Sequence, residues 1–326
     1  MIVNANLNPI YSDVSVIIPA YNCSQSILRA LESIFMQSAP PKEVIIVDDG
    51  SQDDTQGVVE GSEYANRVTY VKQTNAGPSK ARNNAISLAT CEWLAFLDAD
   101  DLWVDKDKLR LQMELIDKHP DAVLIDTYAS VDWHGQREET ESRQKDGEVL
   151  KQFLYSNIIN ATSSVLAKRE DVVEIGGFVD DLRFGEDRLL WAQLAKVGGV
   201  YTLPLVTVKK FNAIGNLTSK GDKNYHYRVD LVNRLLGFID APKSELADIW
   251  LTNVIDFFRL SFKANDPATY LLIFNDTLKH KGAKLWLTKY GFLAIQAKIF
   301  SSFTPLLFLK SNLKKGSKTD SDTAKI

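Results

Sequence analysis

The chain has 326 residues, of which 45% are hydrophobic and 25% are charged, and its formal net charge is −4. This composition excludes an intrinsically disordered chain, a collagen-like chain and a small disulfide-stabilised scaffold. At about 150 residues per domain, the length allows two domains, or one α/β domain with a large appendage. Cys23 and Cys91 are too few for a disulfide framework, and they do not stand at zinc-site spacing with histidines.

The two ends of the chain bear on its compartment and partners. The first ten residues lack the basic segment and the long apolar core of a secretory signal, so we expect a protein of the reducing cytoplasm. No stretch offers the ~20 apolar residues that a membrane span needs, and the nearest one, residues 292–309, is interrupted by Gln296, Lys298 and Pro305. Residues 279–326 carry a charge of +8, which leaves −12 on the rest. The acidic body argues against a nucleic-acid partner.

Apolar strands and amphipathic helices alternate through the first part of the sequence. Strands are predicted at residues 14–18, 43–48, 68–72, 93–97 and 122–126, with helices at 27–35, 78–89 and 109–116. The polar residues 132–149 predict a surface loop or hairpin, and a strand (163–167), a helix (186–197) and a strand (200–208) follow. Ser24 is the expected N-cap of the first helix. This order predicts an α/β fold with a Rossmann-like, mostly parallel sheet and helices on both faces.

Beyond about residue 222 the pattern is helical only. Helices are predicted within residues 231–239, 246–262 and 270–278, followed by an apolar stretch at 285–309 and a disordered tail. In the apolar stretch, large hydrophobic residues alternate with lysines, as in helices that lie on a membrane surface. A helical lid on the body, with lysines whose apolar stems are covered, is the alternative. We therefore divide the chain into residues 1–221, 222–312 and 313–326.

Polar clusters directly follow three of the predicted strands, at residues 21–22, 48–51 and 98–100. Because ligands of open α/β sheets bind beyond the carboxyl ends of the strands, we expect these clusters to meet at one edge. Asp98 and Asp100 are two residues apart at a strand end, so an extended backbone points both the same way. Their repulsion predicts a site for Mg²⁺ or Mn²⁺ with a substrate phosphate. The alternative is an acidic helix start that Asp101 or Asp105 caps.

Three further segments have both a structural and a functional interpretation. Asp48 and Asp49 lie in a sequence that is typical of turns, but a carboxylate there could also accept a hydrogen bond from a nucleobase. Gly77 precedes a predicted helix whose first turns hold Arg82, which is either a solvated residue or a contact for a base or phosphate. The acidic pair at 186–187 either favours the start of a helix or supplies a general base.

Six motifs in this order together resemble the family 2 glycosyltransferases: PAYN (19–22), VDDGS (47–51), NAGPSKARN (75–83), FLDADD (96–101), GGF (176–178) and GED (185–187). The resemblance covers about residues 14–210. It implies an inverting enzyme with the glycosyltransferase A fold, of the bacterial surface-polysaccharide type. Such an enzyme moves a sugar from a nucleotide-diphosphate donor, a UDP-sugar first, to an acceptor hydroxyl of a lipid-linked saccharide. The resemblance also implies that residues 1–221 form the donor-binding catalytic domain. The helical region would then contact the acceptor, or the cytoplasmic face of the inner membrane.

The resemblance implies a role for each matching residue. The donor-binding residues would be Pro19, Ala20, Tyr21, Asn22, Asp48, Asp49, Gly77, Arg82, Asp98 and Ala99. Within this set, Asp49 would bond the base, Arg82 would flank it and Asp98 would lie near the ribose or the metal. Asp100 would bind Mn²⁺ or Mg²⁺. Asp187 would be the general base, with Glu186 as the alternative, and Trp103 would border the acceptor site.

One segment departs from the family pattern. Family members often carry a metal-completing histidine after the strand that ends near residue 208, and residues 208–216 have none. Lys209, Lys210 or Asn212 would then contact the diphosphate, or the metal would rely on Asp100, phosphates and water. The missing histidine favours, as an alternative, a catalytically silent nucleotide-sugar-binding protein. A dinucleotide oxidoreductase lacks support, because PAYNCSQS rather than G-x-G-x-x-G follows the first strand.

Overall fold

The computed structural model describes residues 12–133, 136–140, 145–212, 225–263 and 266–281. Its contacts divide the chain into two compact units, Met1–Leu235 and Leu236–Ile326. The apolar stretch predicted at 285–309 and the tail at 313–326 lie outside the described residues. The proposed membrane contact of that region therefore stays a prediction.

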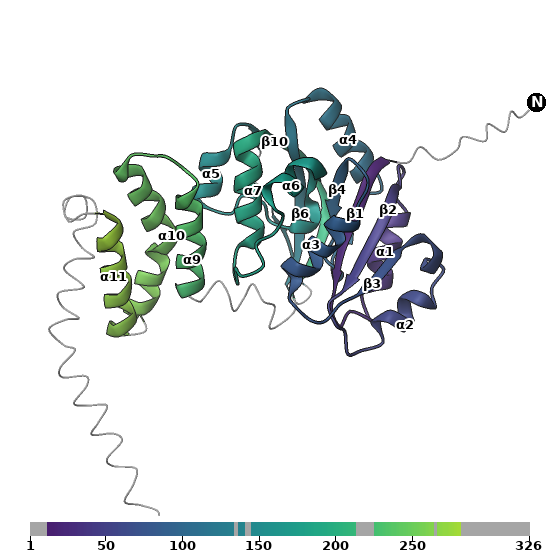
Figure 1. Ribbon diagram of the computed structural model, residues 1–326, viewed down its shortest axis with the longest axis horizontal. Helices are drawn as coiled ribbons and strands as arrows, with labels where there is room; N and C mark the ends of the chain where they lie inside the picture. Colours follow the sequence, from purple (N-terminus) through teal and green to yellow (C-terminus); the bar gives the residue numbers. More distant parts are fainter. Residues whose placement is uncertain (1–11, 134–135, 141–144, 213–224, 264–265, 282–326) are drawn as a thin grey trace, which may run out of the picture. The chain divides into compact units, whose positions relative to one another are not determined.

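A ten-stranded sheet forms the centre of the first unit (Figure 1). Along the sheet, the order of the main strands is β3-β2-β1-β4-β9-β6-β10-β5, while β7 pairs with β6 and β8 pairs with β10. The strands are β1 (Ser12–Ala20), β2 (Pro41–Asp48), β3 (Thr69–Lys72), β4 (Trp93–Phe96), β5 (Leu102–Trp103), β6 (Ala122–Trp133), β7 (Gln136–Thr140), β8 (Asp146–Gly147), β9 (Leu166–Lys168) and β10 (Gly199–Asn212).

The sheet is parallel where the sequence alternates between strand and helix, and mixed elsewhere. Neighbours among β3, β2, β1 and β4 are parallel, as are β6 and β10. The three-residue strand β9 enters between β4 and β6 and runs antiparallel to both. The predicted hairpin appears as the antiparallel pair of β6 and β7. The expected α/β fold is therefore confirmed, with more antiparallel pairing than the sequence alone predicts.

Helices cover both faces of the sheet. The helices of the first unit are α1 (Ile27–Phe35), α2 (Thr55–Glu60), α3 (Pro78–Leu88), α4 (Lys108–Lys118), α5 (Leu150–Tyr155), α6 (Arg169–Ile175), α7 (Glu186–Val197) and most of α9 (Tyr225–Gly237), with short 3₁₀ turns η1 (Ala65–Arg67) and η2 (Thr162–Ser164). Strand β4 shows the two faces clearly. Trp93 and Ala95 belong to the core that α1 and α4 cover. Phe96 points the other way, where its ring centroid lies 5.6 Å from that of Trp191 on α7.

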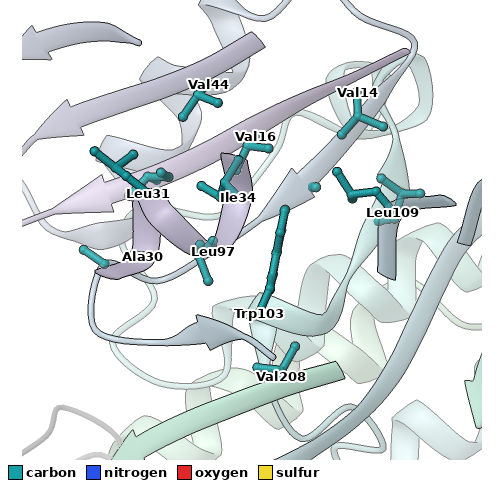
Figure 2. Close-up of a cluster of buried hydrophobic side chains, with 14 of the residues drawn as sticks. Val14, Val16, Ala30, Leu31, Ile34, Val44, Leu97, Trp103, Leu109 and Val208 are labelled. Carbon is teal, nitrogen blue, oxygen red and sulfur yellow. The ribbon is translucent and has the colours of Figure 1, made fainter. Parts of the chain in front are cut away.

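The core between the sheet and α1 is closed by residues that are distant in sequence (Figure 2). Val16 of β1, Leu31 of α1 and Leu109 of α4 are completely buried there. Trp103 belongs to the same cluster, is 4% exposed, and donates a hydrogen bond from Nε1 to the carbonyl of Ser163 at 2.9 Å. Its burial corrects the prediction that Trp103 borders an acceptor site, because no surface of the ring is left for a substrate.

The caps of two helices differ from prediction. Helix α1 starts at Ile27 as predicted, but Ser26 rather than Ser24 stands at the N-cap position. Helix α4 starts at Lys108, with Asp107 at the N-cap. Asp101 does not cap α4, because its carboxylate is buried and accepts a hydrogen bond from Ser163. A partner that is far away in sequence thus fixes the position of Asp101, which the local pattern does not predict.

Two helices, α10 (Lys243–Lys263) and α11 (Pro267–Lys281), make up most of the described part of the second unit. Trp250 and Thr277 join them by a 3.2 Å hydrogen bond, and the rings of Phe258 and Tyr270 meet edge to face at 5.1 Å. The predicted C-terminal helices are present. Helix α9 instead belongs largely to the first unit, where the Arg234 guanidinium pairs with Asp181 at 2.9 Å. None of the described helices has the length and hydropathy that crossing a membrane requires.

The burial of Trp103 leads to a stability prediction. Trp103→Phe removes the buried Nε1–H and leaves the Ser163 carbonyl unpaired, so we expect the free energy of unfolding to fall by about 1–3 kcal/mol. The neighbouring Val104 is 50% exposed, and Val104→Ala should change the free energy of unfolding by less than about 0.5 kcal/mol. Urea unfolding of both variants measures this, and equal stabilities would contradict the buried position of Trp103.

Candidate functional site

The carboxyl ends of the first three strands lie level with one another. The register pairs Ala20 of β1 with Asp48 of β2, and Asp48 with Lys72 of β3. The loops that follow these strands carry the PAYN and VDDGS motifs and lead into α3. The sheet thus brings to one edge the segments that the sequence predicts to meet there.

Asp49 organises the loop that leads into α3. Its carboxylate accepts three hydrogen bonds of 2.8 Å, from the Gln73 side chain and from the backbone N–H groups of Ala76 and Gly77. Gly77 has a φ of +92°, a conformation that favours glycine, and this turns its N–H toward Asp49. A carboxylate offers about four acceptor positions, so these three bonds leave about one unused. Asp49 itself is 4% exposed, and its contact with a nucleobase stays a prediction.

Tyr21 and Asn22 form the exposed part of the loop after β1. Tyr21 is 51% exposed. Asn22 has a φ of +49°, which is unusual for a residue other than glycine, and its N–H donates to the Ser51 hydroxyl at 2.9 Å. This bond ties the loop after β1 to the loop after β2. The remaining predicted donor contacts nearby are half-buried or buried: Pro19, Ala20, Asp48 and Ala99.

Asp48, Ala20 and Ala99 stand behind the surface of the site. Asp48 is completely buried, and its carboxylate accepts hydrogen bonds from the Ser51 N–H at 2.7 Å and the Tyr70 hydroxyl at 2.5 Å. Ala20 and Ala99 are 1% and 6% exposed and belong to the hydrophobic core. These residues shape the loops that a donor would meet, and their direct contact with a donor stays a prediction.

Arg82 lies at the centre of the site. It is 6% exposed, and its Nη2 donates to Asp98 Oδ1 at 2.7 Å while Nη1 lies 3.7 Å from Glu186 Oε1. The guanidinium carbon is also 5.2 Å from the ring centroid of Phe178, of the GGF motif. Burial opposes the charge of Arg82, but the two carboxylates raise its pKa above the usual value. One side chain of α3 thus joins the end of β4 to the start of α7.

The buried side chain of Asp101 holds the turn after β4 in place. Asp101 is 2% exposed, and its carboxylate accepts hydrogen bonds from the Ser163 hydroxyl at 2.6 Å and from the Phe211 N–H at 3.3 Å. The Ser163 oxygen also accepts a bond from the Asp98 N–H at 3.1 Å. Burial and the neighbouring Asp98 and Asp100 raise the pKa of Asp101 to about 8. Asp101 therefore anchors the turn, and Asp100 is left exposed on it.

Asp100 is suited to a divalent cation that is shared with a phosphate. The residues of Asp98-Ala-Asp100 do not form a complete protein cage, and among the described residues no group of three or more acidic, histidine or cysteine side chains does. Mg²⁺ and Mn²⁺ accept one or two carboxylates, with waters and substrate phosphates as the other ligands. Although Asp100 is exposed, the surrounding turn partly desolvates its carboxylate, and this desolvation and repulsion from Asp98 raise its pKa. A cation relieves such repulsion. The donor set thus fits an ion that arrives with a diphosphate.

The start of α7 holds two carboxylates that face different partners. Gly185 precedes them with a φ of +76°. Glu186 faces Arg82, and burial together with Asp187 raises its pKa to about 7. Asp187 has a different partner: its Oδ2 accepts a 3.3 Å hydrogen bond from the side chain of Asn157, which is exposed. The two acids are thus distinct in their surroundings.

Three residues of the site lack an assigned role in the sequence analysis. Asn157 and Ser163 lie in a stretch with no local motif, and they reach Asp187 and Asp98 across long sequence separations. Phe178 stands in the GGF motif, where only the glycines attract notice. Its backbone N–H and C=O are both bound by the side chain of Asn83. No local signal in the sequence distinguishes Asn157 and Ser163 from the other polar residues between the motifs.

Comparison with known proteins places the chain in a family. The sequence profile of Glycosyl transferase family 2 matches residues 15–176. TuaG of Bacillus subtilis (strain 168), a glycosyltransferase assigned to teichuronic acid biosynthesis, is 32% identical over 199 residues, which cover 57% of this chain and 73% of TuaG. The chain belongs to glycosyl transferase family 2. An uncharacterised glycosyltransferase of Rickettsia felis is 31% identical over 68% of the chain, and the chain spans 36% of that relative's length.

Solved structures share the fold of this family 2 chain. TarS 1–349 of Staphylococcus aureus, in complex with UDP-GlcNAc, has a TM-score of 0.65 at 22% identity, with 82% of this chain and 81% of that chain covered. The mannosyltransferase PcManGT of Pyrobaculum calidifontis, in complex with GDP-Man and Mn²⁺, has a TM-score of 0.54 at 20% identity, with 89% and 84% covered. The predicted glycosyltransferase A fold is confirmed.

The environment of Glu186 predicts how stability depends on pH. Burial and the neighbouring Asp187 raise the pKa of Glu186 from the ordinary 4.5 to about 7, so ionising this partly buried group, whose side chain is 23% exposed, costs folding free energy as the pH rises between these values. Glu186→Gln removes this cost. We expect its stability relative to the wild type to increase by about 2–3 kcal/mol between pH 4.5 and pH 8. Urea unfolding at both pH values measures it, with the exposed Glu32→Gln as the control. A difference that is the same at both pH values would contradict the assignment.

Proposed function

We propose that the chain is an inverting, nucleotide-sugar-dependent glycosyltransferase that takes a UDP-sugar as its donor. The observation that carries the proposal is the bridge of Arg82, which joins the aspartate turn after β4 to the acidic pair on α7. A donor held at the aspartate turn and an acceptor held at the acidic pair would then lie next to each other, on either side of Arg82. The UDP-GlcNAc complex of TarS supports the choice of donor.

The acceptor class follows from the relatives. TuaG is assigned to teichuronic acid biosynthesis, and ExoO of Rhizobium meliloti is a succinoglycan biosynthesis protein. Both names refer to bacterial surface polysaccharides. We propose that the acceptor is a hydroxyl group of a growing saccharide of this kind, carried on a lipid. The relatives support the saccharide, while the lipid carrier rests on the sequence resemblance alone.

The donor would be held by the loops at the strand ends. The exposed ring of Tyr21 is available to stack on the base, and the remaining acceptor position of Asp49 would take a base N–H. Asp98, fixed by Arg82, would contact the ribose. Asp100 would hold Mn²⁺ or Mg²⁺, which when bound supplies positive charge against the diphosphate.

Asp187 is our choice for the general base. Its carboxylate is held by Asn157, whereas Glu186 is directed toward the buried Arg82. Asp187 would bind the acceptor hydroxyl and take its proton as the oxygen attacks the anomeric carbon from the face opposite the diphosphate. Such general-base catalysis contributes about 10²–10⁴-fold to the rate.

Replacement of the base tests the proposal. Asp187→Asn keeps the shape of the side chain but cannot accept the proton, so we expect unchanged UDP affinity and about a 10²–10⁴-fold lower transfer rate. The measurement is UDP release from UDP-GlcNAc and other UDP-sugars with a surface-polysaccharide acceptor. Asp180→Asn, an acidic residue paired with Lys80 outside the site, is the control. Near wild-type turnover in Asp187→Asn would contradict the assignment. Donor binding by the wild type with neither transfer nor hydrolysis would favour the silent binding protein.

The metal assignment has its own test. Asp100→Asn removes the exposed carboxylate charge, so Mn²⁺ should no longer increase the affinity for UDP. Thermal unfolding with UDP, with and without Mn²⁺, reports this binding by mass action. The wild type should show an additional rise of the melting temperature with Mn²⁺ that the variant lacks. An equal Mn²⁺-dependent rise in both proteins would remove Asp100 from the metal site.

A further inference from the structure

Two adjacent lysines on β10 have different surroundings. The Lys209 ammonium lies 3.1 Å from Asp132 Oδ2 and 4.7 Å from the ring centroid of Phe211. Lys209 and Phe211 are two residues apart on a strand, so they share one face of the sheet, and Lys210 between them points to the other. Lys209 therefore already has an ion-pair partner, while Lys210 contacts neither Asp132 nor Phe211 in this way.

The register of β10 brings Lys210 to the aspartate turn. Strand β5 runs antiparallel to β10, with Leu102 opposite Lys209, so the next residue of β10 reaches the level of Asp101. The N–H of Phe211 confirms this level, because it donates to the Asp101 carboxylate. Lys210 thus lies next to the turn that carries Asp98 and Asp100, with its position fixed by backbone pairing.

Lys210 lies at the level of the aspartate turn and is bonded to none of its carboxylates. In the part of the chain that the structure describes, no ion pair or hydrogen bond occupies the half-buried Lys210 ammonium. Asp98 is already paired with Arg82 and Asp101 with Ser163 and Phe211. A free cation beside an exposed Asp100 is suited to a ligand that carries negative charge.

We propose that Lys210 binds the diphosphate of the donor, an inference that rests on the proposed function. An ammonium group is a compact charge with three donors, and lysine binds phosphates as a point charge. The cation at Asp100 and the Lys210 ammonium would together neutralise the diphosphate while it is bound and as it leaves. Of the three residues that the sequence offers for this contact, Lys209 is engaged elsewhere, and the side chain of Asn212 lies outside the described residues.

The test compares Lys210→Met with Lys209→Met, which removes the same charge from the neighbouring residue. Calorimetry with UDP and Mn²⁺ measures the diphosphate, and ligand-observed NMR with uridine measures the nucleoside without phosphate. We expect Lys210→Met to weaken UDP binding about tenfold or more, as for the loss of a charge-assisted bond, and to leave uridine binding unchanged. Lys209→Met should stay within about threefold for both ligands. Lys210→Arg should recover most of the UDP affinity.

Several outcomes would overturn the assignment. Equal UDP affinities of the two methionine variants would show that Lys210 makes no contact with the diphosphate. Loss of uridine together with UDP, in both Lys210→Met and Lys210→Gln, would show that Lys210 only supports the fold. A wild-type protein that binds no UDP would instead contradict the proposed donor, and the ground for the diphosphate contact would fall with it. The UDP affinity of the wild type thus separates failure of the donor proposal from failure of the Lys210 proposal.

Discussion

The buried guanidinium of Arg82 is the interaction on which the site depends. A charged group that is 6% exposed is stable in the folded protein only when opposite charge compensates it. Asp98 does so at 2.7 Å, and Glu186, 3.7 Å away on another element, adds its charge once it ionises, at about pH 7. Removing one partner of a buried ion pair typically costs about 3–5 kcal/mol, because the other charge is left uncompensated. The same requirement that keeps Arg82 in the fold therefore keeps the end of β4 next to the start of α7.

A second link holds α3, which carries Arg82, against the sheet edge. Asp49 at the end of β2 accepts hydrogen bonds from the backbone at the start of α3. Contacts thus run without a break from the loop after β2, through α3, to the acidic pair on α7. This continuity allows residues that are separated by more than a hundred positions to form one site. Asp101 likewise joins distant segments, because it holds the turn after β4 to Ser163 and to the backbone of β10.

Local patterns predict a large part of this structure. The helix predicted at 186–197 has the bounds that the structure gives α7, and the first strands end where the polar motifs begin, because propensity and turn chemistry act within a few residues. The partners of Arg82, the three donors on Asp49 and the burial of Trp103 are set by packing between distant segments, which a single sequence does not record. The direction of β9 is a similar case, because its three residues contain no signal for antiparallel pairing.

The most direct test of this account is a double-mutant cycle between Arg82→Met and Asp98→Asn, with the free energy of unfolding in urea as the readout. The account predicts a coupling of at least about 1 kcal/mol, because the two side chains share a buried 2.7 Å ion pair. Effects that add to within about 0.3–0.5 kcal/mol would show that the residues act independently, and would contradict the bridge that unites the site.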